Sequence, residues 1–184
     1  MDSSRYKRYP TPEAVPTRKF IQHPTKQDVF LPVHRRPMRM LGVDYTSKNI
    51  VFFVTFNTDR LCEVLLTDEN GQCVWDAILD EIARIGCHIY AVCMMPDHIH
   101  LLLSPSGKGE SLSDIIRRIK TRACTILRQQ MNLYLRWQTS FHDHVLRSSE
   151  REDDEFQAIV NYIYTNPDRA GLGDDYPFRC TNIP

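Results

Sequence analysis

The feature that most restricts the possible folds is a pair of apolar segments, residues 88–95 and 98–103, separated only by Pro96 and Asp97. The segments, HIYAVCMM and HIHLLL, are rich in β-forming residues and have the lengths of buried strands. A Pro-Asp pair favours a tight turn. The sequence therefore predicts two strands joined as a hairpin near the middle of the chain.

Further elements are expected on both sides of this hairpin. Residues 50–56 (IVFFVTF) predict an earlier strand, and residues 137–147 could hold a later one. Apolar residues at helical spacing predict three helices: one ending at Gly86, one from Ser111 or Ser113 to about Met131, and one closed by Asn166-Pro167 and Gly171. The order β-α-β-β-α-β-α predicts an α+β fold of the ferredoxin-like split βαβ type. In that fold a four-stranded antiparallel sheet carries two helices on one face, and here a C-terminal helix is added.

His98 and His100 stand two residues apart on the second strand of the hairpin, so their side chains share one face of the sheet. Two imidazoles on one face can bind a single metal ion. The alternative is a pair of ordinary histidines on a half-solvated strand, because H-x-H is a short and common pattern. A second pair, His142 and His144, has the same spacing and could contact DNA or simply belong to a polar edge strand.

The last expected helix carries NYIYTNP, residues 161–167. Tyr162 lies on one flank of its apolar stripe, Asn166 follows one turn later on that flank, and Tyr164 falls on the opposite flank. A phenol and an amide this close could serve one site, the phenol as nucleophile and the amide as a metal ligand. The alternative is a half-buried tyrosine followed by a helix stop, since Pro167 disfavours helical geometry at Asn166.

The 23 basic and 23 acidic residues cancel, but the basic residues are unevenly distributed. Residues 1–40 hold nine Lys or Arg, three acids and six of the eleven prolines, which predicts a basic, Pro-rich and partly disordered arm over residues 1–48. Residues 115–136 hold six basic residues and no acid, which favours a phosphate track over the commoner solvated helix face. The predicted DNA-binding residues are Arg117, Arg118, Lys120, Arg122, Arg128 and Arg147.

Several classes of protein are not expected. The longest apolar run, from Ile89 to Met95, has seven residues, far short of the ~20 that a membrane span needs. The N-terminal residues lack the apolar stretch of a secretory signal. The six cysteines form no CxxC pair, so neither a zinc ribbon nor a dense disulfide scaffold is indicated. A cytoplasmic protein with reduced thiols is expected.

Three motifs, in this order, resemble the HUH single-tyrosine (IS200-like) transposases. VCMMPDHIHLLLSP is similar to the family's Met-Pro-Asn-His-x-His-Leu signature, with Asp97 in place of the usual Asn. LRWQTSFHDHVLR and NYIYTNPDRAGL resemble the Trp-Gln and Tyr-Ile-x-x-Asn-Pro-x-Arg-Ala-Gly-Leu blocks of one branch, the REP-associated tyrosine transposases. Asp168 replaces a residue that is often small and apolar there. The likeness spans about residues 49–177, so residues 49–184 are expected to form the domain, and neither aspartate is expected to touch the chemistry directly.

The resemblance implies a divalent metal ion, Mg²⁺ or Mn²⁺, bound by His98 and His100 with Asn166 as a third ligand, and it implies Tyr162 as the catalytic nucleophile. The implied reaction is cleavage and rejoining of single-stranded DNA at palindromic hairpins through a 5′-phosphotyrosine intermediate. The expected partner is hairpin or single-stranded DNA in the nucleoid, with no membrane; monomer and homodimer both stay open. Two alternatives remain: a domesticated, catalytically silent protein that binds DNA hairpins, and a metal-dependent phosphodiesterase that acts through water.

Overall fold

The computed structural model of the protein describes residues 40–59, 68–146, 154–173 and 175–183. All of them belong to one compact unit, Pro37–Pro184. The predicted arm up to residue 39 and the predicted DNA-binding residue Arg147 lie outside the described residues. None of the described helices is both long and apolar enough to span a membrane.

The centre of the fold is a five-stranded antiparallel sheet in the order β4-β1-β3-β2-β5. Its strands are β1 (Val51–Asn57), β2 (His88–Met94), β3 (His98–Ser104), β4 (His142–Leu146) and β5 (Arg179–Ile183). The first four confirm the predicted split βαβ arrangement. The prediction of four strands was one short, because β5 pairs with the outer edge of β2, a partner distant in sequence.

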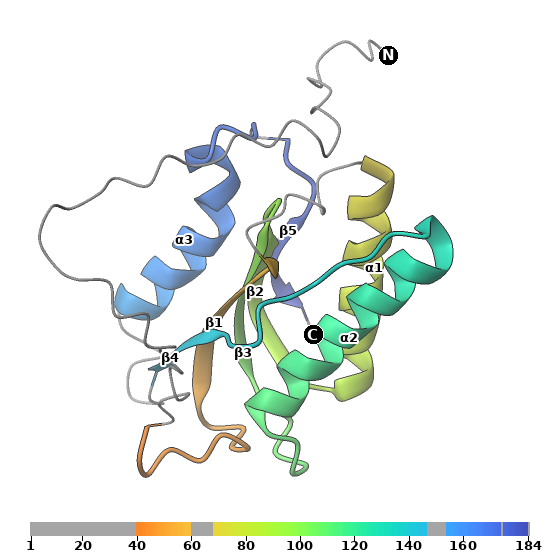
Figure 1. Cartoon of the computed structure of the whole chain (residues 1–184). Coiled ribbons are helices and arrows are strands. Elements are labelled where there is room, and N and C mark those ends of the chain that lie inside the picture. Colours follow the sequence, from red (N-terminus) through yellow and green to blue (C-terminus); the bar gives the residue numbers. More distant parts are fainter. Residues whose placement is uncertain (1–39, 60–67, 147–153, 174, 184) are drawn as a thin grey trace, which may run out of the picture. The chain divides into compact units, whose positions relative to one another are not determined.

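Helices cover both faces of the sheet (Figure 1). On one face lie α1 (Asp68–Ile85) and α2 (Leu112–Met131), and on the other lies α3 (Asp154–Arg169). Gly86 follows α1 at φ +71°, a conformation that glycine adopts without strain. The predicted elements are therefore present, with helices α1 and α2 on one side of the sheet as expected and the added C-terminal helix on the other.

The end of α3 differs from the prediction. The helix was expected to be closed by Asn166-Pro167 and Gly171. It runs through Asn166 and Pro167 and ends at Arg169, two residues before Gly171, and the Asn166 carbonyl accepts a hydrogen bond from Ala170 N at 3.0 Å. A proline this near a helix end removes one backbone donor without interrupting a long run of hydrogen bonds, so its cost is small here. Asn166 therefore has a helical position one turn after Tyr162.

The packed part of the chain begins earlier than the predicted boundary at residue 49. The ring of Tyr45 stacks on Phe52 of β1 with 5.3 Å between centroids. The Tyr45 carbonyl also accepts a hydrogen bond from Leu112 N at 2.9 Å, at the start of α2. Residues in this segment thus contact both the sheet and a helix.

Ser111 caps α2, and its removal should cost about 1 kcal/mol. Its Oγ accepts a hydrogen bond from Asp114 N at 3.2 Å and donates one to Asp114 Oδ2 at 2.7 Å. We expect Ser111→Ala to lower the free energy of unfolding, measured by urea denaturation, by this amount. Ser113→Ala, already inside the helix, should lose less; equal losses would contradict the assignment of the cap.

Candidate active site

The two histidines of β3 form the centre of a polar site on the face of the sheet that α3 covers. Ile99, Leu101 and Leu103 of β3 are fully buried in the core against α1 and α2. The alternating residues His98 and His100 therefore face α3, where their Nε2 atoms lie 3.0 Å apart. The pair thus points into one small volume, as the spacing predicted.

A neighbouring oxygen orients each ring. His98 Nδ1 lies 2.6 Å from Asp97 Oδ1, and His100 Nδ1 lies 2.9 Å from Thr55 Oγ1 on β1. In the tautomer in which each Nδ1–H donates to its oxygen, both Nε2 lone pairs are available on the facing side. Such a second contact is what fixes the tautomer of a metal-binding histidine.

His100 is kept neutral by its surroundings. The residue is 5% exposed. Burial, and secondarily the proximity of His98, lower the pKa of His100 to about 3. At neutral pH its ring is therefore an uncharged ligand or hydrogen-bonding group rather than a cation.

Helix α3 brings Tyr162 and Asn166 to the same place. The amide nitrogen of Asn166 lies 3.3 Å from His100 Nε2. The ring of Tyr162 lies 5.6 Å from the His100 ring and 6.0 Å from the Phe53 ring, centroid to centroid. Tyr162 is 38% exposed, so its ring is held by packing while solvent and substrate can reach the side chain.

These residues fit a divalent metal ion. Ligand atoms at neighbouring positions of an octahedral shell with bonds of about 2.1 Å lie roughly 3.0 Å apart, and the two Nε2 atoms have that spacing. The Asn166 side chain can turn its amide oxygen toward the same point. Among the described residues there is no cluster of three or more His, Cys, Asp or Glu side chains arranged for a metal. Water or phosphate oxygens would therefore complete the shell.

Tyr164 lies elsewhere, on the other flank of α3. The guanidinium carbon of Arg179 lies 4.7 Å from the centre of the Tyr164 ring. Arg179 Nη1 also donates to the Tyr164 carbonyl at 2.9 Å and to Asp168 at 2.8 Å. Tyr164 and Asp168 thus belong to a contact between α3 and β5, apart from the histidine pair.

The predicted phosphate track on α2 lies on the opposite face of the sheet from the histidines. Acids outside the acid-free segment pair with its arginines: Arg117 with Asp114 at 3.2 Å, Arg118 with Glu81 at 2.7 Å and with Glu110, and Arg122 with Asp80 at 3.4 Å. Lys120 donates to two backbone carbonyls, and burial lowers its pKa to about 8. DNA contact by α2 stays a prediction, and its exposed arginines, Arg117 and Arg128, are the candidates for it.

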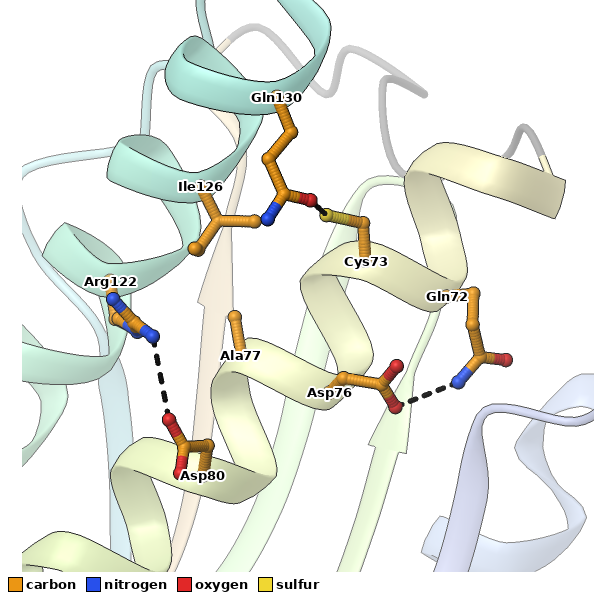
Figure 2. Close-up of a pocket in the computed structure, with 8 residues that line it drawn as sticks. All are labelled: Gln72, Cys73, Asp76, Ala77, Asp80, Arg122, Ile126 and Gln130. Carbon is orange, nitrogen blue, oxygen red and sulfur yellow. Dashed lines mark hydrogen bonds and ion pairs between the residues drawn. The ribbon is translucent and has the colours of Figure 1, made fainter.

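A pocket of about 830 Å³ opens between α1 and α2 (Figure 2). These two helices pack on the face of the sheet opposite to α3 and the histidines. Arg122 and Asp80 meet across the pocket, and Cys73 Sγ donates to Gln130 Oε1 at 2.6 Å. Every residue that lines it belongs to one of these two helices. The pocket is therefore distinct from the site formed by β3 and α3.

The second histidine pair lies on the same face as the first. His142 pairs with Thr55 of β1, which in turn pairs with His100, so the three side chains share one row across the sheet. His144 Nε2 lies 3.3 Å from Glu155 Oε1 of α3. The second pair therefore borders the site on the sheet face that α3 covers, and a contact of this pair with DNA stays a prediction.

Two residues of the site were missed from the sequence. Asp97 was expected not to touch the chemistry directly; its carboxylate contacts His98 at 2.6 Å, so it belongs to the site through that ring. Thr55 was overlooked because its role depends on the register of β1 against β3. The signal for Asp97 was its place directly before the first histidine, whereas nothing local pointed to Thr55.

Comparisons with known proteins agree on one family. The family described as "Transposase IS200 like" matches residues 53–166. A Haemophilus influenzae protein provisionally named as a REP-associated tyrosine transposase is 26% identical over 148 residues, which cover 73% of this chain and 81% of the relative. A second H. influenzae protein, of no stated function, is 21% identical over 164 residues, covering 73% of this chain and 88% of the relative.

One solved structure is similar over most of the domain. It is described as a REP-associated tyrosine transposase bound to a REP hairpin, and it matches with a TM-score of 0.59 and 25% identity. The match covers 74% of this chain and 79% of that chain. The fold and the family of the present chain are thereby supported by independent comparisons.

The contact between Asp97 and His98 predicts an effect on metal binding. Asp97→Ala removes the acceptor that orients the ring, and loss of such a partner typically weakens metal affinity about 10–100-fold. Asp97→Asn keeps an acceptor oxygen and should lose less. Calorimetric titration of each variant with Mn²⁺ measures the difference; equal affinity of wild type and Asp97→Ala would show that Asp97 does not support a metal ligand.

Proposed function

Because this chain belongs to the family of IS200-like transposases, we propose that it cleaves and rejoins DNA at palindromic hairpins through a covalent link to Tyr162. The observation that carries this proposal is the meeting of four side chains from β3 and α3. The Tyr162 ring packs against His100, the Asn166 amide lies within 3.3 Å of the same histidine, and His98 completes the group.

In the proposed reaction the Tyr162 oxygen attacks a DNA phosphorus. The phenol loses its proton, a Tyr162 O–P bond forms, and the bond from phosphorus to the 3′ oxygen breaks. That oxygen takes up a proton and leaves as a 3′-hydroxyl. One phosphoester bond forms in the 5′-phosphotyrosine for the one that breaks in the DNA. A 3′-hydroxyl can therefore reverse the step and rejoin DNA without ATP.

We propose that His98, His100 and Asn166 would hold a divalent ion, Mg²⁺ or Mn²⁺, beside the reacting phosphate. When bound, such an ion polarises a phosphoryl oxygen and offsets its negative charge. The chain's own contribution is orientation. Asp97 and Thr55 hold the two rings, and Phe53 and His100 hold the Tyr162 ring near the attack position.

We propose hairpin DNA as the partner because the similar solved structure is of a transposase bound to a REP hairpin. The reaction would take place in the cytoplasm on chromosomal DNA. A silent protein that only binds hairpins is the second candidate. Both candidates would have the same side chains together at this site. The silent protein is distinguished by forming no covalent adduct with DNA.

The two tyrosines of α3 should differ completely in function. Tyr162→Phe removes one hydroxyl, keeps the ring contacts with Phe53 and His100, and should change the free energy of unfolding by less than about 0.5 kcal/mol. It should abolish both cleavage and adduct formation, whereas Tyr164→Phe, on the other flank, should retain both. The measurement is denaturing electrophoresis of the protein with Mn²⁺ and a labelled hairpin oligonucleotide copied from the DNA flanking its gene, followed by mass spectrometry of the adduct.

Each rival mechanism gives its own result in this assay. Cleavage that survives Tyr162→Phe and needs Mn²⁺ indicates a phosphodiesterase that acts through water. Hairpin binding by wild type without any adduct indicates the silent protein. A nucleotide attached to Tyr164 would overturn the choice of nucleophile.

The exposed arginines of α2 give a separate prediction about affinity. If they contact a hairpin, Arg117→Ala with Arg128→Ala should reduce the slope of log K against log salt by about 0.7–0.9 for each lost phosphate contact. Arg118 is unsuitable for this test because its removal would leave Glu81 and Glu110 without their cation. Fluorescence anisotropy at several salt concentrations measures the slope, and an unchanged slope would remove α2 from the interface.

A further inference from the structure

The proposed reaction places an anionic phosphodiester on the α3 face of the sheet, and attack by the phenol adds negative charge there. A cation supplied by the protein on this face would stabilise that charge. The basic residues of α2 lie on the opposite face. The arginines that contact α3 are the remaining candidates for such a cation.

Arg179 and Arg169 both lie against tyrosine rings of α3, but only Arg179 is neutralised. The Arg179 guanidinium contacts both carboxylate oxygens of Asp168 at 2.8 Å, and its side chain is 8% exposed. It is committed to holding β5 against α3. Because the Arg179 guanidinium is enclosed and its charge is compensated by Asp168, it is a poor candidate for binding a substrate phosphate.

Arg169 differs from Arg179 in its exposure and in its pairing with carboxylates. It follows Tyr162 and Asn166 at positions i, i+4 and i+7, so the three residues form one stripe along α3. Its guanidinium carbon lies 5.3 Å from the centre of the Tyr162 ring. Arg169 is exposed, and within the described residues no carboxylate pairs with it.

We propose that Arg169 binds the scissile phosphate and is a catalytic residue of this site, an inference that rests on the function proposed above. The planar guanidinium can donate two hydrogen bonds to a phosphate. The guanidinium carbon lies 5.3 Å from the centre of the Tyr162 ring, and a phosphorus ready for attack would lie only about 3–3.5 Å from the phenolic oxygen of the same residue. One phosphate can thus meet the nucleophile and the cation at the same time.

A purely structural role is the competing explanation. An arginine in the last turn of a helix interacts favourably with the helix dipole and with a ring below it. Such a role would depend on the protein alone, whereas phosphate binding depends on the charge of one particular phosphate. The test therefore changes the charge of the substrate as well as the arginine.

The experiment uses hairpin oligonucleotides copied from the DNA flanking the gene, with one neutral methylphosphonate placed in turn at each position of the single-stranded tail. Binding is measured without divalent metal ions, so that no metal contact to the phosphate contributes. The proteins compared are Tyr162→Phe, which cannot form the link, and Tyr162→Phe with Arg169→Ala. We expect one tail position at which the neutral group weakens binding to Tyr162→Phe about 10-fold and leaves binding to the double variant unchanged. Additive effects at every position would overturn the proposal.

Kinetics supply the second measurement. With Tyr162 present, Arg169→Ala should slow single-turnover adduct formation at saturating DNA about 100-fold or more. Arg169→Lys should recover part of the rate, and added guanidinium ion should rescue the alanine variant in part. Arg84→Ala, which removes an exposed arginine from α1 on the other face, is the matched control and should keep the wild-type rate. A rate unaffected by Arg169→Ala would contradict the catalytic role.

The two measurements separate this inference from the proposed function. A wild-type protein that forms no adduct overturns the transposase chemistry, yet the binding series still reports whether Arg169 contacts one phosphate. An adduct that forms at the wild-type rate in Arg169→Ala leaves the chemistry intact and overturns the role of Arg169.

Discussion

The whole site depends on the alternation of side chains along β3 between two covered faces of the sheet. Ile99, Leu101 and Leu103 are fully buried on the side of α1 and α2. A shift of one residue would exchange the two faces, placing imidazoles in the apolar core at a large cost. The packing on one face therefore determines where His98 and His100 point on the other.

The same reasoning extends to the partners of the histidines. Thr55 reaches His100 because the register of β1 against β3 pairs these two residues. On α3, the buried Ile163 and its apolar neighbours pack against the sheet, which turns the flank carrying Tyr162 and Asn166 toward β3. The nucleophile and the histidines thus come together through two separate apolar contacts, neither of which includes a catalytic group.

Local patterns were sufficient to predict much of this fold. The hairpin around Pro96, the capping of α2 by Ser111 and the end of α1 at Gly86 each depend on residues close together in sequence. The strand β5 and the role of Thr55 were not predictable in this way, because each is defined by a partner on a distant strand. The helical position of Asn166 was also uncertain from sequence, since Pro167 disfavours it locally and the packing of α3 outweighs that preference.

The net charge of a surface was the property that the sequence alone predicted least well. The acid-free segment of α2 suggested a strong positive surface, yet Glu81 and Asp80 of α1 and Glu110 of the preceding loop compensate Arg118 and Arg122. Surface charges act on a ligand within about one Debye length, ~8–10 Å. A basic residue attracts a phosphate only to the extent that neighbouring acids do not compensate its charge. By that measure a single arginine over the Tyr162 ring matters more to the proposed chemistry than a paired cluster across the sheet. The relevant quantity is the unpaired charge that faces the reacting group, and it is defined only once the chain is folded.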